Sequence, residues 1–260
     1  MFSTHRAQDS IMTRRVIGTA LLIAVALPAH AAELKVLSGN GARSAVAELC
    51  AQFERATGHK VTIDFAVNPQ VRQRIESGEQ FDVAILNPPV LDALVAQGRI
   101  VGATRSVIGR AGIGMAARAG VPAPDISTVA AFTRTLLNAR SVAYPGEGAS
   151  GKYFVTVVDR LGITPQMASK MRPMPAEYNV EVVGRGEVEF VVVVASRIAG
   201  VPGVQFVGLI PQELQTWIGF AGGVSGAARE PDVARELLRF LTSPAAVPVL
   251  EKAGIQPFKE

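Results

Sequence analysis

A glycine-containing turn that follows a short apolar run and precedes a helical pattern occurs twice in this chain. The two stretches are residues 36–43, VLSGNGAR, and residues 144–152, YPGEGASGK. After the first turn, apolar residues recur with the spacing of one helix face, at Val46, Leu49, Cys50 and Phe53. Glycine permits the tight turn. Strand, turn and helix in this order predict an α/β fold, with such turns at one edge of a sheet.

Both turns are suited to hold an anion. The first N–H groups of a helix lack an internal partner and carry partial positive charge, so helix starts bind anions readily. We therefore expect two lobes, one from each half of the chain, that close on one small anion. Arg43 and Lys152 each fall in the first turn of a predicted helix, where a cation is disfavoured by roughly 0.3–1 kcal/mol. A bound anion would remove that conflict; alternatively, both side chains extend into water.

The first residues have the pattern of a secretory signal peptide. Arg14 and Arg15 precede an apolar stretch, residues 16–27, that is too short to span a bilayer, and an Ala-x-Ala site follows at residues 29–31. We expect residues 1–31 to be removed by cleavage after Ala31 and the protein to be periplasmic. An uncleaved membrane anchor is the alternative, and Met12 is an alternative start.

Charge and composition argue against nucleic acid as a partner. The predicted signal peptide carries Arg6, Arg14 and Arg15 against Asp9, so its removal lowers the net charge from +4 to +2. No run rich in Lys or Arg occurs, and only three Tyr and one Trp could stack on bases. The hydrophobic share of 48% predicts a folded protein with a sizeable core. Cys50 is the single cysteine, so no internal disulfide can form.

Strand and helix patterns alternate through the first half of the chain. Strands are predicted over residues 34–37, 61–67 and 81–86, and helices from Gly41 to about Gly58, over 70–77 and over 90–97. Such alternation favours a parallel sheet with right-handed crossovers. Ligands bind beyond the carboxyl ends of these strands, which places candidate ligand residues in the turns 38–43, 67–69 and 87–89.

The second half begins after an extended, Gly-rich stretch, residues 107–117, and a Gly- and Pro-rich boundary at 118–124. Strands are predicted over 141–144, 190–195, 204–209 and 217–224, the last as a second crossing segment. Helices are predicted over 125–139, 152–161, 165–171, 231–241 and 244–252, with a short helical turn at 211–214. Residues 177–184 fit neither period. The apolar run at 190–195 predicts a strand buried on both faces.

The pattern gives no positive sign of catalysis. Residues 146–153 nearly match the phosphate loop of nucleotide hydrolases, but Tyr153 stands where that loop needs Ser or Thr for Mg²⁺. After signal removal His59 is the one histidine that remains, and it follows a helix end rather than a nucleophile motif. His, Cys and carboxylates do not cluster at metal-binding spacing. We therefore predict no enzyme activity, no metal and no cofactor.

From residue 34 to residue 257 the chain resembles the extracytoplasmic solute-binding proteins of ABC importers, in the molybdate-binding branch of the type II fold. The resemblance rests on the order and spacing of short motifs. These are VLSG at 36–39, FxxxTGHxV at 53–61, RIExGxxxDV at 74–83, GxxG at 148–151, RLGI at 160–163, GE at 186–187, GLIPxEL at 208–214, LTSP at 241–244 and GI at 254–255.

The resemblance implies two α/β lobes with central mixed sheets, joined by two crossing segments. Lobe 1 would comprise residues 32–118 and 216–260, and lobe 2 residues 119–215. The molybdate pattern has hydroxyl side chains in its first two turns, where this chain has Gly41 and Asn68. Its backbone donors in lobe 2 fall at Ser150 and Gly151, and its late tyrosine is replaced by Val194. The complete set of candidate ligand residues is Ser38, Gly39, Asn40, Gly41, Val67, Asn68, Asn87, Ser150, Gly151, Lys152 and Val194.

At least two ligand hydroxyls of the molybdate pattern are therefore missing. The anion is molybdate- or tungstate-like, or a small organic carboxylate, since asparagine and charged donors suit either. The function implied is capture of a small anion and its delivery to an ABC transporter permease by a monomeric protein. A receptor that presents its ligand to a sensor and a secreted enzyme on a similar fold are the alternatives.

Overall fold

The computed structural model describes residues 1–2, 31–175 and 180–258. Ala31–Glu260 forms one compact unit by its internal contacts, and the following description concerns this unit. Most of the predicted signal peptide lies outside the described residues, as does the first part of the ambiguous stretch at 177–184. Ala31 is exposed, whereas Ala32 is buried and its N–H donates to Nδ1 of His59 at 3.1 Å.

A mixed sheet runs through the unit in the order β2-β1-β3-β9-β4-β7-β5-β6, with β8 and β10 pairing with β4 outside this order. The first three strands are parallel, as predicted, whereas β9 is antiparallel to both β3 and β4. The strands are β1 (Glu33–Gly39), β2 (Lys60–Ala66), β3 (Val83–Leu86), β4 (Ser106–Arg118), β5 (Val142–Pro145), β6 (Met171–Met174), β7 (Phe190–Val194), β8 (Val204–Leu209), β9 (Trp217–Val224) and β10 (Gln256–Pro257).

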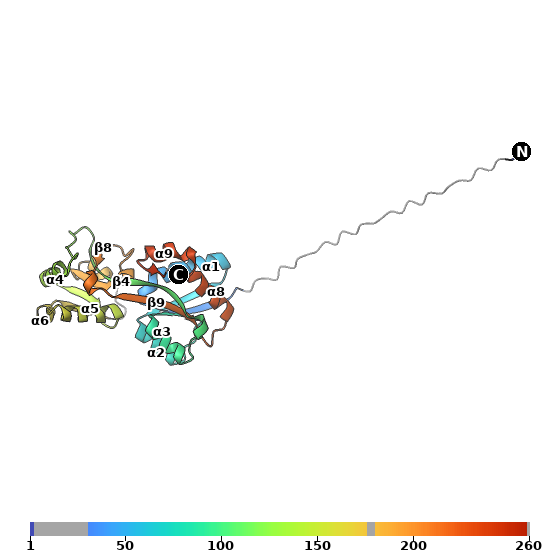
Figure 1. The fold of residues 1–260 in the computed structure, drawn as a ribbon, viewed down its shortest axis with the longest axis horizontal. Coiled ribbons are helices and arrows are strands. Elements are labelled where there is room, and N and C mark those ends of the chain that lie inside the picture. Colours follow the sequence, from blue (N-terminus) through green and yellow to red (C-terminus); the bar gives the residue numbers. More distant parts are fainter. Residues whose placement is uncertain (3–30, 176–179, 259–260) are drawn as a thin grey trace. The chain divides into compact units, whose positions relative to one another are not determined.

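Helices cover both faces of the sheet around β1 and β3 (Figure 1). Successive strand residues face opposite sides, so Val36 packs in one core cluster with the helices α1 and α8, and Leu37 packs in another with α2 and α3. The described helices are α1 (Arg43–Thr57), α2 (Asn68–Glu76), α3 (Pro88–Ala96), α4 (Val129–Asn138), α5 (Ala149–Arg160), α6 (Thr164–Met167), α7 (Glu181–Gly184), α8 (Pro231–Leu241) and α9 (Val247–Lys252).

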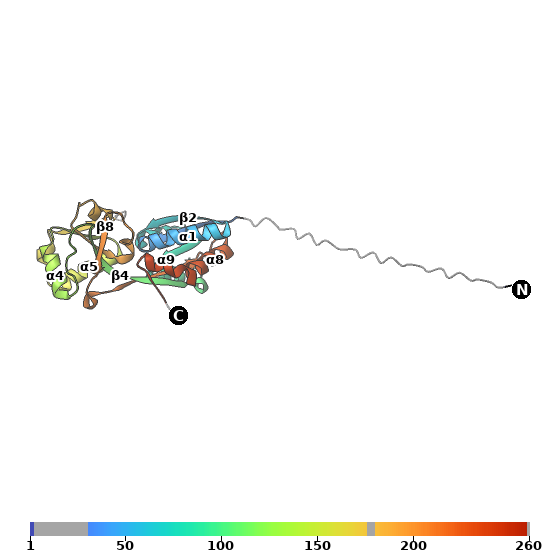
Figure 2. The same cartoon turned by 90° about the horizontal axis from the view of Figure 1, so that it is seen from above.

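The second lobe is built around β5 and β7. Phe132 of α4 and Phe154 of α5 pack against Val192 of β7, and all three side chains are fully buried. The neighbouring Val191 and Val193 face the other way and join the core cluster of α1 and α8. Every residue of β7 is buried, which confirms the strand predicted to be covered on both faces. Figure 2 shows α4 and α5 at the end of the unit opposite α1 and α8.

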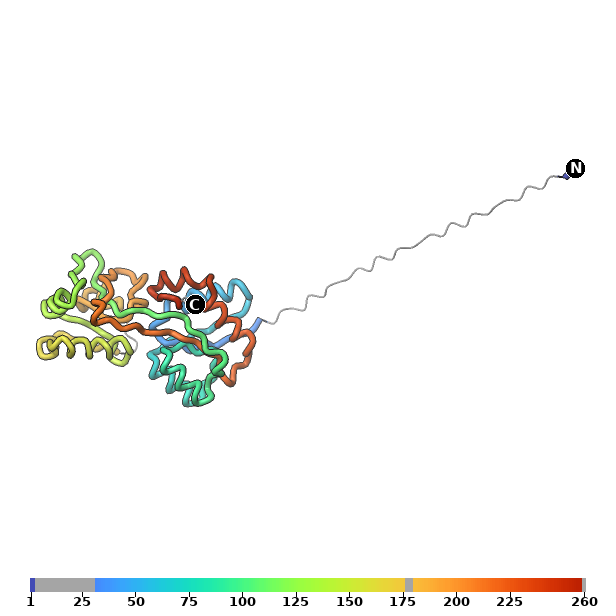
Figure 3. The backbone as a smooth tube through the Cα atoms, in the orientation of Figure 1, coloured from blue at the N-terminus to red at the C-terminus, as the bar shows by residue number. Residues whose placement is uncertain are grey.

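Two strands, β4 and β9, run side by side between the lobes (Figure 3). β4 has 13 residues: its first half pairs with β9, and from Ile113 onward it pairs with β7 and β8. The side chain of Gln215 bridges the change of partner, because its Oε1 accepts from the N–H of Ile113 at 2.7 Å and its Nε2 donates to the carbonyl of Ile113 at 3.0 Å. These are the two crossing segments that the sequence predicts.

Some local expectations are wrong. The helix expected over 165–171 stops at Met167, and Met171–Met174 forms the edge strand β6 instead. The helix expected from residue 125 begins at Val129, because Thr128 caps it by accepting from the N–H of Ala131 at 3.1 Å. The helix expected from residue 152 begins three residues earlier, at Ala149. The turn expected at Asn68 is the first turn of α2.

Candidate functional site

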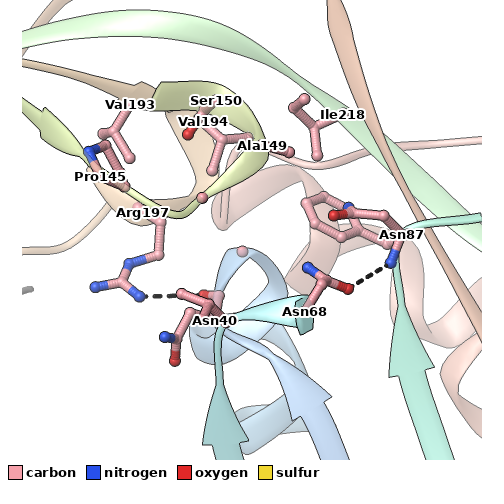
Figure 4. Close-up of a pocket in the computed structure, with 14 residues that line it drawn as sticks. Asn40, Asn68, Asn87, Pro145, Ala149, Ser150, Val193, Val194, Arg197 and Ile218 are labelled. Carbon is pink, nitrogen blue, oxygen red and sulfur yellow. Dashed lines mark hydrogen bonds between the residues drawn. The ribbon is translucent and has the colours of Figure 1, made fainter. Parts of the chain in front are cut away.

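A cavity of about 60 Å³ lies between the two lobes, where the carboxyl ends of β1, β3, β5 and β7 meet (Figure 4). This is roughly four to six times the ~10–15 Å³ that one water needs. Its lining residues are Asn40, Gly41, Val67, Asn68, Asn87, Pro145, Gly148, Ala149, Ser150, Val193, Val194, Arg197, Ile218 and Phe220. Both lobes and the crossing strand β9 therefore contribute to one site.

The start of α5 forms the lobe 2 side of the cavity. Gly148 precedes the helix without a side-chain cap, and the first intrahelical bond recorded runs from the N–H of Lys152 to the carbonyl of Gly148. The N–H groups of Ala149 and Ser150 belong to the set that has no acceptor within a helix. Ser150 is 5% exposed, and its hydroxyl makes no hydrogen bond to the described residues. A buried hydroxyl of this kind calls for a partner.

Gly151 explains how the helix start comes so close to the strand before it. A Cβ at position 151 would lie 1.8 Å from the carbonyl oxygen of Pro145, which no side chain can do. Glycine at this position therefore lets α5 cross directly over the end of β5, and it brings Ser150 to the cavity. Gly151 itself is buried beneath the site and is not among the lining residues.

Arg197 brings a positive charge to the cavity from the turn after β7. Its Nη1 donates to the carbonyl of Asn40 at 3.4 Å, the contact drawn in Figure 4. The preceding residue, Ser196, is buried and donates from Oγ to the carbonyl of Gly41 at 2.6 Å. These two bonds join the lobes at one edge of the cavity. Among the described lining residues, Arg197 is the one ionisable side chain.

On the lobe 1 side, Asn40 and Gly41 contribute mainly backbone. The side chain of Asn40 accepts from Nη2 of Arg43 at 2.9 Å, and Figure 4 shows its amide on the side away from Ser150. The guanidinium of Arg43 lies 4.3 Å above the ring of Phe65, and partial burial lowers its pKa from the ordinary value. The first-turn cation is thus held by the ring of Phe65, which does not line the cavity, and by the amide of Asn40.

Asn68 and Asn87 form a connected pair at the other edge. The backbone N–H of Asn87 donates to Oδ1 of Asn68 at 2.9 Å, and Nδ2 of Asn87 donates to the carbonyl of Gly219 at 2.8 Å. These bonds fix both amides, and Nδ2 of Asn68 is the donor of the pair that makes no hydrogen bond within the described part of the chain. α3 starts with Pro88 and Pro89, so its first two positions have no N–H to offer a ligand.

The rest of the cavity is apolar. Ile218 and Phe220 alternate along β9 and so face the same side of the strand, and Pro145, Val193 and Val194 complete the wall. The cavity thus combines N–H, amide and guanidinium donors with an apolar wall. The described lining residues include no carboxylate, so the electrostatics favour an anion.

The structure brings seven of the sequence-predicted site residues into the lining: Asn40, Gly41, Val67, Asn68, Asn87, Ser150 and Val194. Four others lie outside it. Ser38 is buried below the first turn and donates to the carbonyl of Gly39, and Gly39 leaves room for the side chain of Asn68. Gly151 lies against Pro145, as described above. Lys152 is exposed, because each helical residue turns by about 100° from the one before it.

Seven lining residues were not predicted from the sequence: Pro145, Gly148, Ala149, Val193, Arg197, Ile218 and Phe220. A usable signal existed for Arg197, since it follows a strand predicted to be buried and β7 is parallel to β5. Its turn therefore lies at the same sheet edge as the start of α5. For Phe220 the alternation of Ile218 and Phe220 in a predicted crossing strand was the available signal.

Outside the cavity, other chemistry is sparse in the described part of the chain. No group of three or more His, Cys, Asp and Glu residues there could hold a metal ion. Cys50 is buried, and burial raises the pKa of its thiol to about 12, which makes it unreactive. No helix in the described part of the chain is both long enough and apolar enough to cross a membrane.

Comparison with known proteins finds relatives of this chain. It is similar to an aconitate isomerase from Pseudomonas sp, with 36% identity over 230 residues that cover 86% of this chain and 87% of that protein. In fold it is similar to the periplasmic molybdate-binding protein of Azotobacter vinelandii, with a TM-score of 0.74 and 18% identity over 87% of this chain and 100% of that chain. It is also similar to the sulfate-binding protein of Mycobacterium tuberculosis, with a TM-score of 0.67 and 16% identity over 88% of each.

The structural similarities at these identities concern the fold, and they agree with the type II binding-protein architecture predicted from the sequence. Solute-binding proteins of this kind deliver small ligands to ABC transporter permeases. The family model of the bacterial extracellular solute-binding proteins matches residues 34–256 of this chain. The chain belongs to that family.

Proposed function

We propose that this protein captures a small organic polycarboxylate of the aconitate type between its lobes and delivers it, outside the cytoplasm, to an ABC transporter permease. The observation that carries the proposal is the buried Ser150 hydroxyl beside the uncapped start of α5, in a cavity that Arg197 also lines. Each of these groups favours a carboxylate, because hydrogen bonds to charged groups are about twice as strong as neutral ones.

The donors come from different elements, namely the start of α5, Arg197 after β7 and Nδ2 of Asn68 on α2, and apolar side chains line the same cavity. This arrangement offers a donor to more than one carboxylate group. A single tetrahedral ion has polar atoms on every side, whereas an organic acid presents carbon to the apolar wall. Among relatives, the aconitate isomerase supports an organic acid, since its name gives aconitate as the molecule it acts on.

Molybdate or a similar oxyanion is the less supported ligand. The fold is shared with a molybdate-binding protein, but the first two turns carry Gly41 and Asn68 rather than hydroxyl side chains. Oδ1 of Asn68 is, in addition, already bonded to the N–H of Asn87. We propose that binding occurs without turnover, by a monomer, after cleavage at Ala31. The exposed position of Ala31, just before the first strand, supports that cleavage site.

Isomerisation of aconitate is a second candidate function. The observation in its favour is the 36% identity to an aconitate isomerase over 86% of this chain. An isomerase would bind the same acid in the same cavity, so the two candidates differ in turnover rather than in ligand class.

Two measurements on the purified mature protein test these proposals. Calorimetric titration with cis-aconitate, trans-aconitate, citrate, sulfate and molybdate should show tightest binding to one of the organic acids; tighter binding of an inorganic oxyanion would refute the polycarboxylate proposal. Proton NMR of each aconitate isomer with catalytic amounts of protein should show no interconversion. Sustained interconversion would replace the receptor function by the isomerase function, and light scattering that gives a stable dimer would contradict the monomer.

A further inference from the structure

Gly41 and Phe220 both line the cavity, and the ring of Phe220 leaves no room for a side chain at position 41. A Cβ at position 41 would lie 2.7 Å from Cε1 of Phe220 and 3.2 Å from its Cζ. Real Cβ atoms essentially never come that close to another heavy atom, so a side chain at position 41 and the ring at position 220 cannot coexist without movement. The backbone of the first turn therefore meets the cavity beside an aromatic ring.

Phe220 is held in this place by the fold. Its strand, β9, is paired on one side with β3 and on the other with β4. The side chain is 3% exposed, and a Cβ at Gly41 would also lie 3.8 Å from Cγ1 of Val194. Phe220 and Val194, from β9 and β7, thus form one apolar patch directly against the lobe 1 turn. We name this patch the Phe220–Val194 wall.

The wall has a consequence for ligand choice. An anion held by Arg197 and the start of α5 has to turn part of its surface toward these two side chains. An oxygen of sulfate or molybdate that faces them loses its water and gains no hydrogen bond. A carbon atom of an organic acid loses nothing there and buries apolar surface instead.

We infer that the Phe220–Val194 wall is the specificity element of the site, which selects carboxylic acids with a carbon face against inorganic tetrahedral oxyanions. This rests on the proposed function, since it concerns the ligand of the same cavity. Gly41 is part of the element, because its missing side chain is what lets the ring of Phe220 reach the turn.

The test measures, by calorimetry, the dissociation constant for sulfate divided by that for the tighter-binding aconitate isomer. This ratio is compared across four proteins. Wild type gives the reference ratio. The double variant Gly41→Ser/Phe220→Ala removes the ring and puts a hydroxyl in the space it leaves. Val194→Thr adds a hydroxyl to the wall at nearly constant shape. Phe206→Ala, at an exposed aromatic residue of β8 that does not line the cavity, is the control.

We expect the ratio to fall at least thirtyfold in the double variant and at least fivefold in Val194→Thr, and to stay within twofold in Phe206→Ala. If the double variant does not fold by circular dichroism, Val194→Thr decides. A ratio that stays within twofold in Val194→Thr, or in a folded double variant, overturns the inference. Wild type that binds no carboxylic acid overturns the proposed function itself, so the two failures are distinguishable.

Discussion

Replacement of Ser150 by alanine should affect stability and binding in opposite directions. The hydroxyl is 5% exposed and has no hydrogen-bond partner among the described residues. A buried polar group without a partner costs about 1–3 kcal/mol, so removal of the oxygen should leave the ligand-free protein as stable as wild type or up to about 1 kcal/mol more stable. In a domain of this size 1 kcal/mol corresponds to a Tm increase of roughly 2–4 °C.

Binding should weaken in the same variant. A hydrogen bond to a charged group contributes about 1.5–3 kcal/mol, and each 1.4 kcal/mol is a factor of ten. Ser150→Ala is therefore expected to raise the Kd for the preferred acid by about 10- to 150-fold. The assay pairs calorimetric titration with thermal unfolding, each with and without ligand, because a ligand of the folded state raises Tm.

A second variant separates the hydroxyl from the backbone donor. Ser150→Pro removes both the Oγ and the N–H at the second position of α5. Pro69 and Pro89 stand at the same position of α2 and α3, so a helix start of this protein accepts proline there. We expect Ser150→Pro to abolish ligand-induced stabilisation with the fold retained. If Ser150→Ala lowers the ligand-free Tm by several degrees and leaves Kd unchanged, the hydroxyl is structural and the reasoning fails.

Three further changes test other parts of the structure. Gly151→Ala should destabilise by about 3 kcal/mol or more, because its Cβ would lie 1.8 Å from a carbonyl oxygen; an urea midpoint close to wild type would contradict this. Gln215→Leu should cost about 1–3 kcal/mol in the same assay, since the N–H of Ile113 loses its acceptor while its carbonyl keeps only the N–H of Ile210. Hydrogen bonds from Arg74 hold the pKa of Glu79 at about 2, below the ordinary carboxyl value. This carboxylate therefore stabilises the fold at neutral pH, and its contribution disappears as the pH falls from about 4 through 2. In Glu79→Gln, the free energy of unfolding measured with urea should fall less steeply between about pH 4 and pH 2 than in wild type. An equally steep fall would show that the Arg74–Glu79 ion pair is not the cause.

The elements that the sequence predicts best are those whose pattern is complete within the element. The predicted bounds 204–209, 217–224 and 231–241 coincide with β8, β9 and α8, because their apolar period and their flanking residues agree. β6 was missed for a physical reason. It has four residues, none of them buried, and Pro173 among them, and it pairs with β5 alone. Such an edge strand leaves no alternation of buried positions to detect.

The residues of the candidate site likewise divide into those that a local pattern predicts and those that it does not. Turns at the carboxyl ends of parallel strands are local features, so Asn40, Asn68 and Ser150 could be found from the chain alone. The contacts that give the cavity its charge and its wall are not local. Arg197 bonds to a carbonyl 157 residues away, and Phe220 meets Gly41 from a strand at the other end of the chain. Periodicity within an element carries no information about such pairs.

The change of strand partner along β4 affects ligand binding, because donors on the two lobes can bind one ligand only if the lobes keep one spacing. That spacing depends on the path of β4 at Ile113, where pairing with β9 ends and pairing with β7 and β8 begins. At this point Ile113 is in register with Val194 of β7, and its carbonyl accepts from the N–H of Ile210 at 3.0 Å. The amide of Gln215 adds the acceptor for the N–H of Ile113 and a second donor to its carbonyl, and the N–H of Thr216 donates to the same Gln215 oxygen at 3.0 Å. A looser path of the strand here would cost affinity by the fraction of molecules in which the donors are apart. Gln215 does not line the cavity, yet it fixes the strand that sets the distance between Ser150 and Asn68. Ligand affinity should therefore fall in Gln215→Leu at temperatures where the variant is fully folded, and an unchanged Kd would show that the lobes keep their spacing without this amide.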